Sequence, residues 1–144
     1  MTTVDQLSVL LENQKGALAT VTKILGEAGY NILALSIAEI DNFGVCRLIL
    51  PDSDSAAALL RQRGYTVRIT PVLVVEVPDR PSGLSHVLSI VQREDISLDY
   101  LYSFVRCTLR DALLIFAFSD NARAAEALSE KGVRLLSLDE VLSK

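Results

Sequence analysis

Residues 12–18 read ENQKGAL, and residues 78–84, which lie 66 positions further along the chain, read PDRPSGL. Each stretch follows a short apolar run and precedes a segment with helical periodicity. Each therefore predicts a strand that passes into a helix through a polar loop containing glycine. The recurrence of this loop decides the fold, because it indicates a duplicated structural unit.

The duplication extends beyond the two loops. When residues 7–35 are shifted by 66 positions, five apolar residues meet identical ones: Leu7, Leu18, Val21, Ile24 and Leu35 fall on Leu73, Leu84, Val87, Ile90 and Leu101. Further along the chain the offset becomes 68, which places two extra residues in a hairpin of the second copy. The identities alone are weak evidence. The apolar pattern and the turn signals recur in the same order, and this recurrence carries the interpretation.

Both copies predict the same order of elements. For the first copy we expect strands over 6–11, 31–40, 45–50 and 65–70, with helices over 17–28 and 53–63. For the second we expect strands over 72–77, 96–105, 112–118 and 133–137, with helices starting near 84 and over 121–131. Ser137 followed by Glu140 predicts a capping box and one last helical turn.

This βαββαβ order is that of the ferredoxin-like unit. The expected fold class is therefore α+β, with two ferredoxin-like domains over residues 1–70 and 71–144. Each domain should have an antiparallel sheet with its helices on one face. Units of this size are marginally stable alone, so we expect them to share a surface.

Composition limits the possible functions. Apolar residues make up 50% of the 144 residues, which predicts a packed core. The formal net charge is −4 and the basic residues are spread along the chain, which argues against nucleic acid and against a membrane surface as partners. No apolar run is long enough to span a bilayer, and the first residues lack the pattern of a signal peptide, so we expect a cytoplasmic protein.

Residues that carry catalytic or metal chemistry are sparse. The two cysteines, Cys46 and Cys107, fit buried thiols in a reducing compartment. His86 is the only histidine, and we expect it on a solvated helix face, with Thr20 as its counterpart in the first copy. No motif of a nucleophile, metal site or nucleotide loop is found. We therefore expect no enzyme activity, no cofactor and no metal.

The two loops are the first candidate site. Asn13 and Asp79 are N-cap types of residue, and Pro81 suits the start of a helix. Gly16 and Gly83 allow the backbone to approach a ligand closely. An ordinary helix cap explains these residues, and so does a helix N-terminus whose free amides bind a carboxylate. Two equivalent loops in one short chain favour the second interpretation.

A second candidate is the strand over residues 96–105. Its aromatic side chains Tyr100, Tyr102 and Phe104 share one face. The equivalent residues of the first copy, Ala34, Ser36 and Ala38, are all small. Bulk in one copy and space in the other fit two arrangements: packing of the two units on each other, or a pocket with the tyrosines as one wall.

These loops and this element order resemble the ACT domain family, the small amino-acid-sensing regulatory domains of metabolic enzymes and regulators. The resemblance covers nearly the whole chain as a tandem pair, and it rests on the loop pattern D-x-P-G-x-L before an amphipathic helix. The second copy has Asp79, Pro81 and Leu84 of that pattern, with Ser82 at the glycine position. The first copy has Gly16 and Leu18, with Asn13 and Lys15 in place of the other two. The segment ILALSIAEI, 32–40, is also similar to the second strand of the family.

The resemblance implies a regulatory protein that binds a free amino acid, forms a homodimer, and acts on an enzyme or regulator that the sequence does not identify. The amides near Gly16 or Gly83 would take the ligand's carboxylate. The expected ligand-binding residues are Asn13, Gln14, Lys15, Gly16, Ala17, Leu18, Ile32 and Ser36 in the first copy, and Asp79, Arg80, Pro81, Ser82, Gly83, Leu84, Leu98, Tyr100 and Tyr102 in the second. The alternative is a purely structural or interaction module that assembles through its sheet and helix faces.

Overall fold

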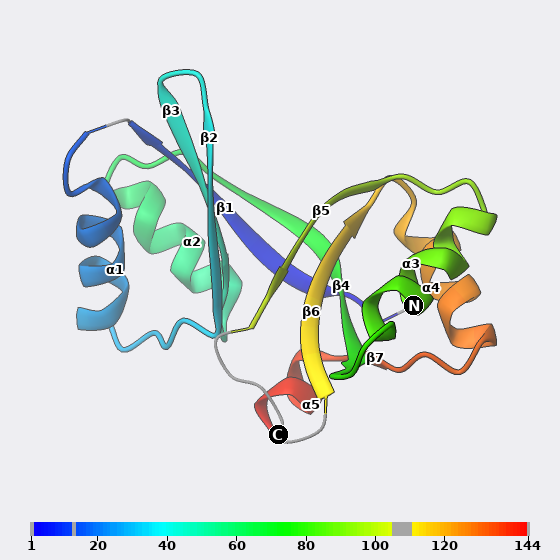
Figure 1. Ribbon diagram of the computed structural model, residues 1–144. Coiled ribbons are helices and arrows are strands. Elements are labelled where there is room, and N and C mark those ends of the chain that lie inside the picture. Colours follow the sequence, from blue (N-terminus) through cyan, green and yellow to red (C-terminus); the bar gives the residue numbers. More distant parts are fainter. Residues whose placement is uncertain (1, 13, 105–110, 144) are drawn as a thin grey trace. The chain divides into compact units, whose positions relative to one another are not determined.

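The computed structural model describes residues 2–12, 14–104 and 111–143. The chain divides into two compact units, both drawn in Figure 1. Asp5–Thr70 form the first unit, and Pro71–Lys144 together with Met1–Val4 form the second. Each unit has a hydrophobic core of its own.

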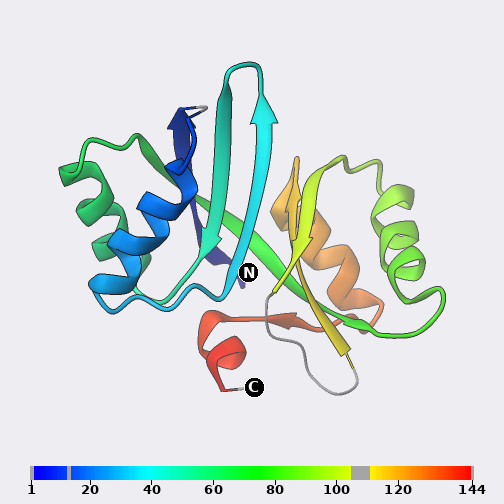
Figure 2. The ribbon, with the colours of Figure 1, turned by 60° about the vertical axis from the view of Figure 1, so that its left-hand side comes forward.

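The first unit follows the βαββαβ order. Its elements are β1 (Val4–Glu12), α1 (Ala17–Glu27), β2 (Ala34–Ile40), β3 (Phe43–Ile49), α2 (Ser53–Gln62) and the beginning of β4 (Val67–Pro78). The strand order is β2-β3-β1-β4, and β1 and β2 both pair with β3 in antiparallel register. Both helices cover the same face of this sheet (Figure 2). Side chains alternate between the two faces of β1, and those of Leu7, Val9 and Leu11 are buried in the core beneath the helices.

The second unit repeats the order. The later part of β4 is its first strand, followed by α3 (Gly83–Arg93), β5 (Leu98–Ser103), β6 (Asp111–Phe118), α4 (Asn121–Glu130), β7 (Leu135–Leu136) and α5 (Leu138–Leu142). The strand order is β7-β4-β6-β5. It is the same as in the first unit, whose order read from its last strand is β4-β1-β3-β2. Its core includes the stacked rings of Phe116 and Phe118, whose centroids are 5.4 Å apart. These strand orders confirm the ferredoxin-like fold class.

Several strands differ from their predicted bounds, among them β4, β2 and β7. The strands expected over 65–70 and 72–77 form one strand, β4, which continues through Pro71. No glycine or Asn-Asp turn signal lies between them, and Pro71 is exposed, where its missing N–H leaves no buried group unpaired. Strand β2 begins at Ala34, three residues later than expected. Strand β7 has only two residues, although the Glu76 amide also donates to the Arg134 carbonyl, at 3.0 Å.

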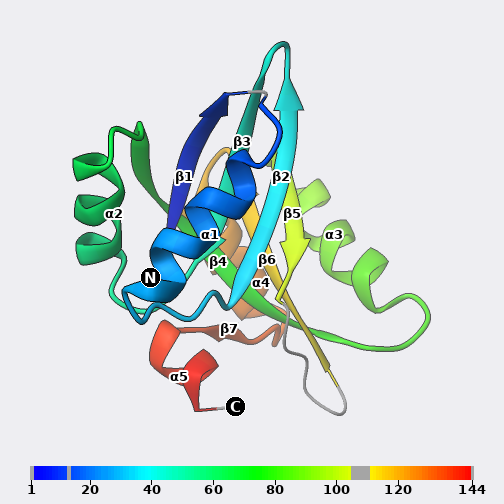
Figure 3. The same cartoon turned by 90° about the vertical axis from the view of Figure 1, so that its left-hand side faces the viewer.

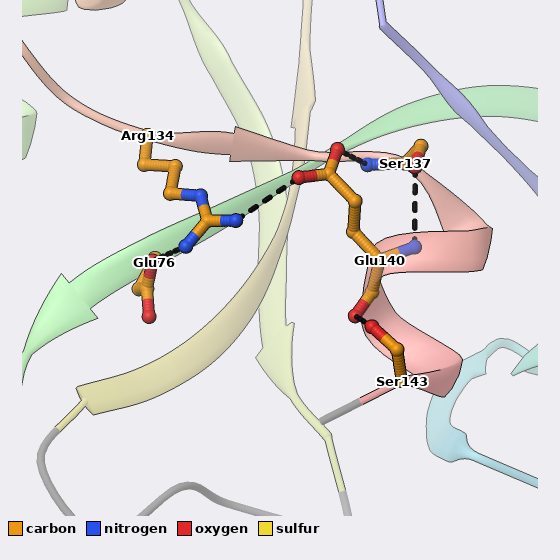
Figure 4. A network of polar contacts seen from close by, with 5 residues as sticks. All are labelled: Glu76, Arg134, Ser137, Glu140 and Ser143. Carbon is orange, nitrogen blue, oxygen red and sulfur yellow. Dashed lines mark hydrogen bonds and ion pairs between the residues drawn. The ribbon is translucent and has the colours of Figure 1, made fainter.

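The last helix, α5, is fixed by the predicted capping box. The Ser137 Oγ accepts from the Glu140 amide at 3.2 Å, and the Glu140 carboxylate accepts from the Ser137 amide at 3.1 Å. Arg134 contacts both Glu140, at 3.1 Å, and Glu76, at 3.5 Å, and so ties α5 to β4 (Figure 4). No helix within the described ranges is long and apolar enough to cross a membrane.

Candidate functional site

The two β–α loops have the same backbone hydrogen bonds. In the first loop the amide of Gln14 donates to Glu12, that of Ala17 to Gln14 and that of Thr20 to Gly16; in the second loop Arg80 donates to Pro78, Gly83 to Arg80 and His86 to Ser82. Each partner in the second set lies 66 positions after its counterpart. The duplication seen in the sequence is therefore a duplication of local structure.

The residue that caps each helix differs from the expectation. The N-cap residues are Gly16 for α1 and Ser82 for α3, both in the left-handed conformation, with φ of 85° and 69°. Neither helix has a side-chain cap hydrogen bond. Asp79 therefore does not cap α3. Pro81 precedes the cap residue instead of opening the helix, because the chain completes a turn before it enters α3. Asn13 lies outside the described residues.

The glycines of the two loops have different physical roles. A side chain at Gly16 would extend into open space, with no heavy atom within 4 Å of its Cβ, so this position needs glycine for its positive φ. A Cβ at Gly83 would lie 2.1 Å from the carbonyl oxygen of Pro78. Gly83 is thus required by close packing of its own loop, and any side chain there would displace the backbone.

A pocket of about 400 Å³ lies beside the first loop. It is lined by Leu10, Leu11 and Glu12 from β1, Gln14, Lys15 and Gly16 from the loop, Ala17 and Thr20 from α1, Phe43 from β3, and Gly64, Tyr65 and Thr66 from the turn before β4. Figure 3 shows the end of β1 and the start of α1 beside the β2–β3 hairpin. All of these residues belong to the first unit.

The start of α1 contributes hydrogen-bond donors to this region. Among the described residues, the amides of Leu18 and Ala19 have no backbone acceptor, as is usual in the first turn of a helix. Thr20 Oγ1 donates to the Gly16 carbonyl at 3.1 Å and holds the cap residue in place. The partial positive charge of a helix N-terminus attracts anions, so this end of the pocket suits a carboxylate.

Two side chains of opposite charge line the same pocket. The Lys15 ammonium belongs to the loop, and the Glu12 carboxylate belongs to the end of β1. Gln14 Nε2 donates to Glu12 Oε2 at 2.9 Å and orients that carboxylate. Residues of both charges are therefore among those that line the pocket.

The expected ligand-binding residues of the first copy divide into two groups. Gln14, Lys15, Gly16 and Ala17 line the pocket. Leu18 and Ile32 pack against the core of the first unit. Ser36 lies on β2 opposite Arg47 of β3 and is not among the lining residues.

In the second copy the expected residues do not line a described pocket. Asp79, Arg80, Pro81 and Ser82 are exposed in the loop, and Gly83 is buried. Leu84 is exposed at the start of α3, and Leu98 packs on the core. Tyr100 and Tyr102 share a face as expected, with stacked rings 6.4 Å apart. The two pockets described in the second unit are lined mainly by α4.

Several pocket residues were missed in the sequence: Leu10, Leu11, Glu12, Thr20, Phe43, Gly64, Tyr65 and Thr66. Leu10, Leu11, Glu12 and Thr20 are close to the loop in sequence, whereas Phe43 and residues 64–66 come from distant segments that pair with β1. Glu12 pairs directly with Phe43, and the Leu10 amide donates to Thr66 at 3.1 Å. One signal was present in the sequence: Phe43 is an aromatic residue in the polar hairpin Asp41–Gly44.

His86 and Cys46 are not among the residues that line this pocket, and Cys107 lies outside the described residues. His86 is exposed, as expected. Cys46 is fully buried, and burial raises the pKa of its thiol to about 11. Among the described residues, no group of three or more His, Cys, Asp or Glu side chains is placed to hold a metal ion.

Comparison with known proteins gives a family model and several solved structures. A family model described as an ACT domain pair matches residues 1–143. The structure of protein BT0572 from Bacteroides thetaiotaomicron is 34% identical, covers 96% of this chain and 95% of that chain, and has a TM-score of 0.90. A comparison with curated protein sequences finds no match.

Two structures share the fold at low identity. The regulatory subunit of aspartate kinase from Thermus thermophilus, in its ligand-free form, is 12% identical with a TM-score of 0.66, covering 90% of this chain and 93% of that chain. The corresponding subunit from Thermus flavus is 15% identical with a TM-score of 0.64, covering 88% of each chain.

Proposed function

The chain belongs to the ACT domain pair family, and from that premise we propose that it is a regulatory protein that binds a free amino acid and has no catalytic activity of its own. Its fold is shared with two proteins that are named as regulatory subunits of aspartate kinase. In this proposal the chain works in the cytoplasm as a homodimer, and its occupancy is sensed by an enzyme or regulator.

The pocket beside the first loop is the observation that carries the proposal. An α-amino acid presents one carboxylate and one ammonium on the same carbon. The residues that line the pocket include Lys15, which carries an ammonium, and Glu12, which carries a carboxylate, together with Gly16 at the start of α1. This pairing of charges is complementary to a zwitterion, and the volume of about 400 Å³ lies in the range of small-molecule pockets, roughly 300–1,000 Å³.

The first loop supports binding better than the second. Gly16 leaves open space above the N-terminus of α1, whereas Ser82 places a side chain at the same position of α3. Lys15 is matched by Pro81, which carries no charge. We therefore propose one amino acid per chain, bound at the first loop.

A thermal-shift screen of the twenty amino acids at millimolar concentration tests the proposal. A ligand at about 100 times its dissociation constant stabilises the protein that binds it by about 2.7 kcal/mol, which gives a measurable rise in melting temperature. If none of the twenty raises the melting temperature, the structural-module interpretation replaces this one.

Charge variants then test where the ligand binds. Lys15→Met and Glu12→Gln each remove one charge-assisted interaction, which is worth about 1.5–3 kcal/mol, so each should weaken binding about tenfold or more by calorimetry. Lys131→Met and Glu39→Gln remove exposed charges outside the pocket and serve as controls. Equal affinities in all four variants would place the ligand elsewhere.

A further inference from the structure

We propose that Tyr65 determines which amino acid binds in the pocket beside the first loop, because its hydroxyl forms a hydrogen bond with a polar side chain of the ligand. The inference rests on the proposed function and adds the chemical class of the ligand: amino acids whose side chain carries a hydroxyl, amide or carboxyl group. It is carried by the turn between α2 and β4, which the charges at the first loop do not involve.

This turn has the same backbone structure in both copies. The amide of Tyr65 donates to the Leu60 carbonyl at 3.1 Å, and the amide of Val133 donates to the Leu128 carbonyl at 3.0 Å. The second pair lies 68 positions after the first, which is the offset found in the sequence for this part of the repeat. Tyr65 and Val133 therefore occupy the same structural position.

The fold does not need a tyrosine at this position. Tyr65 and Val133 are both partly buried, and each packs against the core of its own unit. Tyr65 also lines the pocket of the first unit, whereas Val133 is not among the residues of either pocket described in the second. Valine fills the packing role in the second copy, so the tyrosine adds a phenol ring and a hydroxyl only where the pocket lies.

The Tyr65 hydroxyl is available to a ligand. Among the described residues, none forms a hydrogen bond with it. Tyr30 packs against the same core, but its hydroxyl is hydrogen-bonded to Ser55. A partly buried tyrosine hydroxyl usually has a partner, and it can both donate and accept a hydrogen bond. The hydroxyl of Tyr65 therefore suits an oxygen-bearing group of a bound molecule.

Tyr65 lies on the same side of the sheet as the start of α1. Ala17, the first residue of α1 after its cap Gly16, packs against the same core as Tyr65, and both residues line the pocket. The pairing of Leu10 with Thr66, N–H to carbonyl at 3.1 Å, holds the turn against the end of β1. A ligand that fills this pocket with its carboxylate at the start of α1 therefore contacts the turn as well.

This contact distinguishes polar from apolar side chains. A hydroxyl, amide or carboxyl group of the ligand pairs with the Tyr65 hydroxyl. An apolar side chain of the same shape covers that hydroxyl and leaves it without a partner, which costs affinity. A site that forms a hydrogen bond with one group of its ligand discriminates against the analogue that lacks the group.

Calorimetry with amino acids of matched shape tests the preference. Threonine is compared with valine, asparagine with leucine, and glutamine with methionine. In the pair that contains the tightest ligand, we expect the polar member to bind about tenfold more tightly. If no amino acid binds, the proposed function itself fails. If an amino acid binds but the apolar member binds as tightly as the polar one or more tightly, the proposed function stands and the polar preference is overturned.

Tyr65→Phe tests whether this hydroxyl sets the preference. The variant keeps the ring and its packing, so the preference within the pair should fall to about twofold or less, with the affinity of the apolar member within about twofold of the wild type. Tyr30→Phe is the matched control, since Tyr30 packs against the same core but does not line the pocket, and it should keep the preference. Equal weakening of both members in Tyr65→Phe would assign the hydroxyl to a group common to all amino acids and overturn its role in specificity.

Tyrosine fluorescence gives a second readout of the contact. The chain has four tyrosines and no tryptophan, so tyrosine emission is its intrinsic signal. Saturation with the tightest ligand should change the emission of the wild type and of Tyr30→Phe, and this change should be lost in Tyr65→Phe. No change in the wild type, or an equal change in Tyr65→Phe, would show that the ligand does not contact Tyr65.

Discussion

Gly16 and Ser82 occupy the same position of the two loops, and both adopt positive φ. Glycine adopts this conformation freely, but a residue with a Cβ adopts it at a cost of roughly 1–2 kcal/mol. Ser82 has no side-chain cap hydrogen bond that would offset this cost. The second loop therefore keeps the backbone of the first with an energetic penalty.

Ser82→Gly should stabilise the protein by up to about 1 kcal/mol, because it removes this penalty. Urea denaturation of the variant and the wild type measures the difference. Ser85→Gly, at an exposed position inside α3, is the control and should destabilise by roughly 0.5–1 kcal/mol. An unchanged or lower stability of Ser82→Gly would show that Ser82 is not strained.

Cys46 is predicted to be unreactive in the folded protein. It is 0% exposed, and burial raises its thiol pKa to about 11, so the nucleophilic thiolate is scarce at neutral pH. In a Cys107→Ser variant, which leaves Cys46 as the single thiol, a disulfide reagent should react only after denaturant is added. Rapid stoichiometric reaction in native buffer would contradict the burial of Cys46.

At the scale of elements, α5 depends on a carboxylate. The Ser137 amide, followed by the Arg134 side chain, lowers the pKa of Glu140 below its ordinary value. A carboxylate with a lowered pKa in the folded state stabilises that state above its unfolded pKa, and the contribution is lost as pH falls through the folded pKa. The attachment of α5 through Arg134 should therefore weaken in acid.

Glu140→Gln should make stability less dependent on pH below about 4, because the amide keeps the hydrogen bond from Ser137 but does not titrate. Urea midpoints of the wild type and the variant, measured from neutral pH to pH 3, compare the two. Asp139→Asn, an exposed neighbour on α5, is the control and should keep the wild-type pH dependence. Parallel curves for Glu140→Gln and the wild type would contradict this role of Glu140.

The elements themselves were largely predictable from the sequence. Apolar alternation and turn residues located each strand and helix, and the Ser137–Glu140 spacing predicted the capping box. The errors fell where pairing decides the bounds. Continuity of β4 through Pro71 and the short β7 depend on partner strands that local patterns do not specify.

At the scale of the whole molecule, the sequence predicted only some of the residues that line the candidate site. The loop residues Gln14 to Ala17 were found because the repeat singled them out. Phe43 and Tyr65 were missed because the pairing of β1 with β3 and with the chain before β4 brings them to the loop. Sequence repeats identify a loop, but they do not identify what packs beside it.

We expect the chain to form a homodimer. Each ferredoxin-like unit has its helices on one face of a sheet, and exposed apolar side chains such as Ile37 and Leu142 favour a covered surface. Light scattering at micromolar concentration, with and without amino acid, measures the mass. A monomer under both conditions would contradict this expectation.

The central claim is that the first loop binds an amino acid through the open space above Gly16. The most direct measurement is calorimetry of Gly16→Val beside Gly29→Val, using the amino acid that stabilises the wild type most. Both glycines have positive φ, 85° and 89°, and open space at the Cβ position, but only Gly16 lines the pocket. Both variants should lose about 1–3 kcal/mol of stability from backbone strain. Gly16→Val should lose at least about tenfold in affinity, equivalent to 1.4 kcal/mol, whereas Gly29→Val should bind like the wild type. Full affinity in Gly16→Val, or equal losses in both variants, would show that the loop is only a turn.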